Sequence, residues 1–121
     1  MKVTVRITKS FRIAAKPLLK KYHSLSKDLL LLEQELIAFP HTGTHLGQDV
    51  YKIRLKVTSK GKGKSGGARV ISFVETIAIA SAGKTSESEY SVALLTIYDK
   101  SDVEDISDKE LKDLIKNYRA E

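Results

Sequence analysis

Residues 51–57 alternate strictly between apolar and basic side chains. Four apolar residues fall on one side of this segment: Tyr51, Ile53, Leu55 and Val57. Three basic residues fall on the other side: Lys52, Arg54 and Lys56. A period of two is typical of a β-strand with one buried face. The segment is therefore predicted to be a strand whose second face is cationic.

Three further segments are predicted to be strands. Residues 2–8 alternate in the same way, and residues 68–74 are rich in the β-branched and aromatic side chains that favour strands. Residues 90–98 form the last predicted strand. The stretch from Ser81 to Ser88 is small and polar and is predicted to be a connection.

Apolar residues at helical spacing predict two helices near the N-terminus and one at the C-terminus. Ser10 and Ser26 are placed to cap the first two, with Pro17 kinking the first helix or lying in its first turn and Pro40 ending the second. The run Ser107–Glu110 is a capping box. It precedes an apolar stripe of Leu111, Leu114, Ile115 and Tyr118.

The predicted order is β-α-α-β-β-β-α, which is an α+β fold. Consecutive strands with short links favour an antiparallel sheet of about four strands. A two-helix hairpin at the N-terminus is expected to pack on this sheet, and a helix closes the chain. With 121 residues, of which 41% are hydrophobic, residues 1–121 are expected to form one domain around one modest core.

Positive charge is concentrated in two segments. Residues 1–22 and 50–74 each hold seven Lys or Arg and no acid, within a chain of net charge +6. This distribution predicts a polyanionic partner, with a solvated basic surface as the alternative. The chain has no cysteine, its first residues do not resemble a signal peptide, and no apolar run could span a membrane. A cytoplasmic location is expected.

The basic residues of the predicted strand and the loop after it have the spacing of a phosphate-binding surface. Residues two apart on one strand project the same way, roughly 6.5–7 Å apart, which is comparable to successive phosphates of a nucleic acid strand. The glycine-rich loop adds Lys60, Lys62 and Lys64. Its glycines would let backbone N–H groups approach a phosphate. Together with Lys56, these lysines are predicted to bind RNA; the alternative is a flexible cationic loop.

A nucleotide-binding site is rejected, and a metal site is less favoured than a surface-loop role for the two histidines concerned. A nucleotide-binding P-loop ending at Lys64 and Ser65 would need glycine at position 58, which is Thr58. His41 and His45 lack a third ligand nearby and make at most a partial metal site. We therefore expect neither a metal nor a nucleotide cofactor. RNA cleavage would then depend on lysine or tyrosine for proton transfer and on arginine for charge stabilisation, with Arg54 and Arg69 as candidates.

Four stretches of the chain resemble a known family of toxins. They are Tyr51–Leu55, the loop Ser59–Gly67, Ala68–Ile71, and Leu94–Lys100. They are similar to the HigB-like branch of the RelE/ParE toxins, and the resemblance covers residues 50–107. It implies a RelE-like fold and a ribosome-dependent endoribonuclease that cuts messenger RNA in the decoding site. It also implies that a cognate antitoxin neutralises the protein.

The resemblance assigns phosphate and catalytic contacts to five positions: Lys52, Arg54, Arg69, Tyr98 and Lys100. The founding pattern has Arg and Tyr where this chain has Ser101 and Ser107. The general acid therefore stays open. A purely structural interpretation of two of these residues also stays open, in which Tyr98 is a core side chain and Lys100 a solubilising one.

Two other functions fit the same chain. The first is a ParE-like inhibitor of DNA gyrase, which shares the fold and has no nuclease chemistry. The second is a plain RNA-binding module; it fits the charge, but the Tyr and Phe residues are expected in the core instead of forming a stacking platform. For the toxin, the antitoxin is expected to cover the cationic face with an acidic, largely helical segment.

Overall fold

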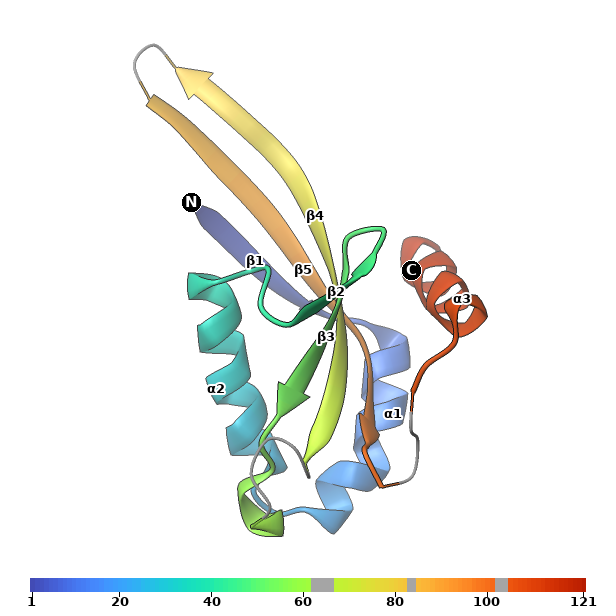
Figure 1. Cartoon of the computed structure of the whole chain (residues 1–121). Helices are drawn as coiled ribbons and strands as arrows, with labels where there is room; N and C mark the ends of the chain where they lie inside the picture. The colour runs from blue at the N-terminus through green and yellow to red at the C-terminus, as the bar shows by residue number, and fades with distance from the viewer. Residues whose placement is uncertain (62–66, 83–84, 102–104) are drawn as a thin grey trace.

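The computed structural model describes residues 1–61, 67–82, 85–101 and 105–121; for residues 78–82 and 85–87 it describes the backbone alone. The elements follow the α+β order that the sequence predicts, with one strand added (Figure 1). They are β1 (Lys2–Ile7), α1 (Lys9–Lys21), α2 (Leu25–Ala38), β2 (Thr44–Gly47), β3 (Val50–Leu55), the 3-10 helix η1 (Thr58–Lys60), β4 (Ala68–Ala82), β5 (Thr85–Asp99) and α3 (Asp108–Arg119).

The five strands form one sheet in the order β1-β5-β4-β3-β2. The predicted antiparallel sheet of about four strands is confirmed as a mostly antiparallel sheet with one strand more. The extra strand β2 pairs with β3, and β1 runs parallel to β5. The parallel pair arises because α1 and α2 separate β1 from the antiparallel strands, so the chain can return to the sheet in either direction.

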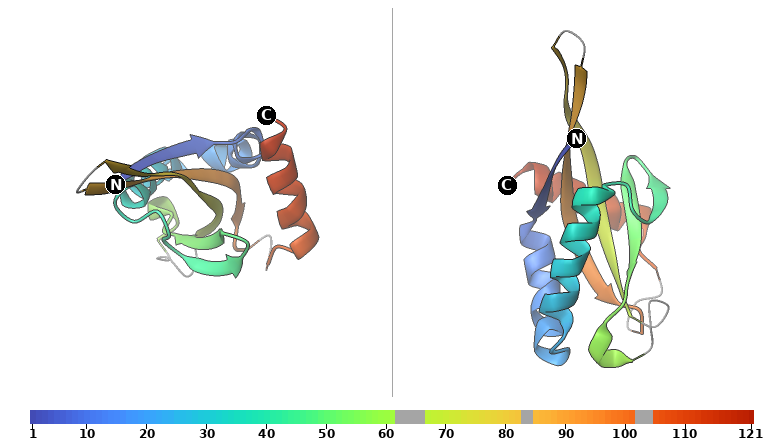
Figure 2. Two further views of the ribbon diagram at one scale, coloured as in Figure 1. Left: turned by 90° about the horizontal axis from the view of Figure 1, so that it is seen from above. Right: turned by 90° about the vertical axis from the view of Figure 1, so that its left-hand side faces the viewer.

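Helices cover both faces of the sheet (Figure 2). The face against α1 and α2 holds the larger buried cluster, including Leu25, Leu36, Val70 and Val92. The other face holds a smaller cluster, in which Val50, Ile71 and Leu95 meet the buried Leu111 of α3. No helix among the residues described is long and apolar enough to cross a membrane.

Strands β4 and β5 form a long hairpin that projects beyond the rest of the molecule (Figure 1). They pair from Ala68 opposite Asp99 to Ala82 opposite Thr85, whereas β3 accompanies β4 only as far as Phe73. The prediction of a connection from Ser81 to Ser88 is therefore wrong, because most of that stretch lies within the two strands. Pairing of the two backbones forms these strands although the side chains are small and polar.

Hydroxyl residues precede the first two helices, as predicted, but at positions two residues earlier in the chain. Thr8, instead of Ser10, caps α1 by accepting a hydrogen bond from the Phe11 N–H. Ser24, instead of Ser26, precedes α2, and Pro17 lies well inside α1. The capping box before α3 is confirmed, since Ser107 accepts from the Glu110 N–H and donates to the Glu110 carboxylate.

Candidate functional site

Three of the predicted site residues form a row across the middle of the sheet. Arg54 on β3 lies opposite Arg69 on β4, which lies opposite Tyr98 on β5. Directly opposed residues of antiparallel strands present their side chains on the same face. Lys52 is two residues before Arg54 and shares that face. We call Lys52, Arg54, Arg69 and Tyr98 together the cationic row, after its three basic members.

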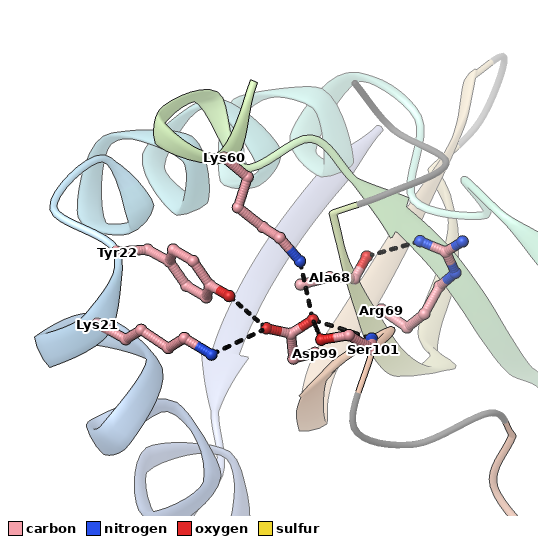
Figure 3. Close-up of polar contacts among 7 residues, drawn as sticks. All are labelled: Lys21, Tyr22, Lys60, Ala68, Arg69, Asp99 and Ser101. Atoms are coloured by element: carbon pink, nitrogen blue, oxygen red, sulfur yellow. Dashed lines mark hydrogen bonds and ion pairs between the residues drawn. The ribbon is translucent and has the colours of Figure 1, made fainter. Parts of the chain in front are cut away.

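The residues of the cationic row differ in solvent exposure from one end of the row to the other. Arg54 is exposed and the Lys52 side chain is 26% exposed, whereas Arg69 is 6% and Tyr98 is 9% exposed. Arg69 donates from Nη1 to the carbonyl oxygen of Ala68 at 3.1 Å (Figure 3). A ligand approaching this face would therefore meet Lys52 and Arg54 first, above a buried guanidinium.

Glycine at position 67 is what lets β4 begin so close to β3. A Cβ atom at Gly67 would lie 2.0 Å from the Leu55 carbonyl oxygen, which is too close for any side chain. Gly67 thus lies close against the β3 backbone, two residues before Arg69. The predicted RNA contacts Lys62 and Lys64 of this loop lie outside the described residues.

Tyr98 combines a core position with a polar atom that has no partner. Tyr98 belongs to the buried cluster under α3, as expected for a core side chain. No described residue forms a hydrogen bond with its buried hydroxyl. Burial raises the pKa of Tyr98, and the negative charges of Asp105 and Glu110 add to this while Arg69 opposes it. At neutral pH the hydroxyl keeps its proton and can act as a hydrogen-bond donor.

An acidic residue faces the cationic row. Asp105 lies just before α3, and one of its carboxylate oxygens is 3.7 Å from the Lys52 ammonium. Asp105 was not among the predicted site residues. The only signal in the sequence is the acidic run that precedes the last helix. Because the Asp105 side chain is 66% exposed, this ion pair is weak and can open to another anion.

Lys60 lies away from the cationic row. Its ammonium donates to the Asp99 carboxylate at 2.9 Å, and the side chain is only 11% exposed (Figure 3). Asp99 follows Tyr98 on β5 and therefore points to the opposite face, toward α1. The hydrogen bond to Asp99 raises the pKa of Lys60. Lys60 is thus engaged in a structural contact and is not presented beside Arg54.

Asp99 is the centre of a buried polar network that sequence reasoning missed. Its carboxylate accepts hydrogen bonds from Tyr22, Lys60, and both the N–H and hydroxyl of Ser101, and Lys21 lies 3.9 Å away (Figure 3). Burial raises the pKa of Asp99, but these hydrogen bonds outweigh burial and hold it well below its usual range. The network ties the end of β5 to α1 and η1.

The remaining predicted lysines lie at strand ends. Lys56 follows β3, is exposed, and lines a groove between α2 and the β3 edge together with Arg54. Lys100 is exposed in the turn after β5, and its backbone N–H donates to the Gly67 carbonyl at 3.3 Å. This bond places Lys100 next to the base of the glycine-rich loop.

The expectation that Tyr and Phe residues lie in the core is wrong for Phe39. This residue is 68% exposed because it follows the last turn of α2. It lines a cleft with His41 and Tyr90, and the His41 ring also contacts Tyr51. His41 and His45 thus contact aromatic rings, and no group of three metal-binding side chains occurs within the described part of the chain.

Comparison of the chain with protein-family models, with curated proteins and with solved structures finds no match. The resemblance to the RelE/ParE toxins therefore stays a prediction from the sequence.

Proposed function

We propose that this chain is a toxin of the RelE/HigB type, a metal-independent endoribonuclease that cuts messenger RNA on the ribosome. The observation that carries the proposal is the register of Arg54, Arg69 and Tyr98 across three adjacent strands, with Lys52 beside them. Two guanidinium groups and an ammonium on one face complement the negative charge of a phosphodiester backbone. Action on translating ribosomes would place the protein in the cytoplasm.

The reaction proposed for this site takes its nucleophile from the RNA itself. The 2′-hydroxyl attacks the adjacent phosphorus, the bond to the 5′-oxygen of the next nucleotide breaks, and a 2′,3′-cyclic phosphate remains. Arg54 and Arg69 stabilise the charge that gathers on the phosphate oxygens. The 2′-hydroxyl loses its proton as it attacks, and our candidate acceptor is Lys52 in its neutral amine form, which becomes an ammonium beside the phosphate. The leaving oxygen gains a proton, for which our candidates are Tyr98 in the row and Lys100 just after β5.

The same charges suggest how the toxin would be silenced. A cognate antitoxin that places carboxylates over Lys52 and Arg54 would block phosphate binding and neutralise like charges that otherwise repel one another. Asp105 already makes one such contact within the chain. We therefore propose an acidic segment as the antitoxin's inhibitory part.

Substitution of the row residues tests this function. Arg54→Gln removes an exposed guanidinium, and Arg12→Gln removes one from the exposed face of α1 as a matched control. We expect Arg54→Gln and Arg69→Ala to lose transcript cleavage and growth inhibition, and Arg12→Gln to keep both. Far-ultraviolet circular dichroism checks that each variant is folded, which matters most for the buried Arg69.

Undiminished cleavage by folded Arg54→Gln and Arg69→Ala would overturn the proposed active site. A wild-type protein that inhibits growth and DNA supercoiling without cutting RNA would instead support the gyrase inhibitor. Binding of RNA with neither effect would support the plain binding module.

A further inference from the structure

A cleft of about 370 Å³ opens beside Tyr98, between the end of β5 and α3. Its walls are Thr96 and Tyr98 from β5, Ile106, and a set from α3 comprising Glu110, Asp113, Leu114 and Asn117. The cleft shares Tyr98 with the cationic row. A nucleotide whose phosphate contacts Lys52 and Arg54 would therefore have its base or that of its neighbour near the cleft.

The helix presents its polar groups to the cleft in a regular pattern. Residues 110, 113, 114 and 117 are three and four apart, so they line one side of α3. Ser107 holds one Glu110 oxygen with a hydrogen bond of 3.1 Å. The side chains of Asp113 and Asn117 form no hydrogen bond or ion pair with any residue that the structure describes. These two are available to a ligand.

The charge of the cleft is opposite to that of the cationic row. Glu110 and Asp113 would repel a phosphate, so the group that enters the cleft must be neutral or positive and must offer N–H donors. Ile106 and Leu114 provide apolar contacts for a flat or aliphatic surface. A nucleobase meets these conditions, because it is neutral, planar and edged with donors and acceptors.

We propose that this cleft binds a guanine base of the RNA next to the cleaved bond, an inference that rests on the proposed function. Guanine is the only common RNA base with two adjacent N–H donors, N1–H and N2–H. These two donors match the two oxygens of the Asp113 carboxylate. The Asn117 amide donates to O6. Uracil would turn carbonyl oxygens toward the carboxylates, and adenine and cytosine would each turn a ring nitrogen acceptor toward them.

The buried Tyr98 hydroxyl is a second sign that a ligand completes this site. It is a donor without a partner among the described residues, on a side chain that both lines the cleft and belongs to the cationic row. Buried polar groups in folded proteins are nearly always satisfied. An oxygen of the bound nucleotide would accept from this hydroxyl, so base binding and phosphate binding would be joined at one residue.

The first test maps the nucleotides that flank each cut on translating ribosomes. For wild type we expect guanine at one fixed position beside the cut, enriched at least about 10-fold over uracil, as a bidentate contact can achieve. Asp113→Asn should reduce this enrichment to about 3-fold or less, because an amide cannot accept two N–H bonds at once. Asp108→Asn removes a carboxylate from α3 outside the cleft and should leave the preference unchanged.

The second test does not depend on cleavage. Guanosine and uridine, which lack phosphate, are titrated into the wild-type protein while the Asn117 side-chain amide signals are followed by NMR. Guanosine should shift these signals and bind at least about 10-fold more tightly than uridine, and Asp113→Asn should remove the difference. Equal binding of the two nucleosides, or an unchanged guanine preference in Asp113→Asn, would overturn the guanine site.

The two tests separate this inference from the function on which it rests. Cleavage without a preferred base would reject the guanine site and leave the nuclease standing. Selective guanosine binding without any RNA cleavage would reject the nuclease and support the site.

Discussion

Arg54 on β3 and Arg69 on β4 lie directly opposite each other in the antiparallel ladder. Like charges in this position repel and cost a strand pair about 0.2–1 kcal/mol. We therefore predict that Arg54→Thr raises the free energy of unfolding by about 0.5 kcal/mol, since threonine also favours strands. Urea denaturation measures the change. Lys56→Thr, which removes a charge just beyond β3, should have almost no effect.

The contrast between the two variants is the informative result. A stabilised Arg54→Thr protein that no longer cuts RNA would mean that the repulsion between Arg54 and Arg69 lowers stability in exchange for phosphate binding. A destabilised Arg54→Thr would show that the two arginines do not repel each other in the folded protein.

Asp99 should matter more for stability than any residue of the cationic row. Asp99→Asn leaves the buried ammonium of Lys60 without its countercharge, and removing one member of a buried pair typically costs about 3 kcal/mol or more. Thermal and urea denaturation test this. Asp105→Asn breaks an exposed ion pair instead and should cost less than about 1 kcal/mol. Similar losses in the two variants would contradict the central role of the Asp99 network.

The same carboxylate predicts how stability depends on pH. The pKa of Asp99 is lower in the folded protein than its ordinary value of 3.8, so the folded state holds the carboxylate charged more strongly than the unfolded chain does. This contribution is complete above the unfolded value and is lost as the pH falls below about 5. Urea unfolding from pH 6 to pH 3 should show a steeper decline for wild type than for Asp99→Asn. Parallel curves would exclude Asp99 as the cause.

We predict that Asp105 competes with RNA for Lys52, because its carboxylate already pairs with the Lys52 ammonium. Asp105→Asn removes the anion 3.7 Å from the Lys52 ammonium, and we predict about 2- to 3-fold tighter binding of a short single-stranded RNA at low salt. The gain should shrink as salt rises, because exposed charges are screened. Fluorescence anisotropy measures both effects, with Asp108→Asn as the control for loss of charge near α3. Weaker RNA binding by Asp105→Asn would mean that Asp105 assists the site.

Periodicity predicted the elements that carry the cationic row. The alternation of residues 51–57 placed Lys52 and Arg54 on one face, and the register of β4 and β5 then brought Arg69 and Tyr98 beside them. The extended hairpin was missed because Ala, Ser and Glu, which are frequent in its outer part, have little strand preference of their own. Only pairing between the two backbones defines those strands.

Contacts between distant residues could not be predicted from spacing. Lys60 belongs to a run of loop lysines in the sequence, and only the fold brings it to Asp99 across the end of the sheet. In the same way, no sequence feature near Lys52 predicts its ion pair with Asp105. Such pairs depend on tertiary packing, which a single sequence does not encode as a visible period.

The chemical identity of the RNA ends tests the central claim most directly. The wild-type protein is added to translating ribosomes, and the 3′ ends of the cut messenger RNA are analysed for phosphate. Attack by the 2′-hydroxyl predicts a 2′,3′-cyclic phosphate on one fragment and a 5′-hydroxyl on the other, with both products lost in Arg54→Gln. Intact messenger RNA, or fragments that end in a 3′-hydroxyl and a 5′-phosphate, would contradict the account.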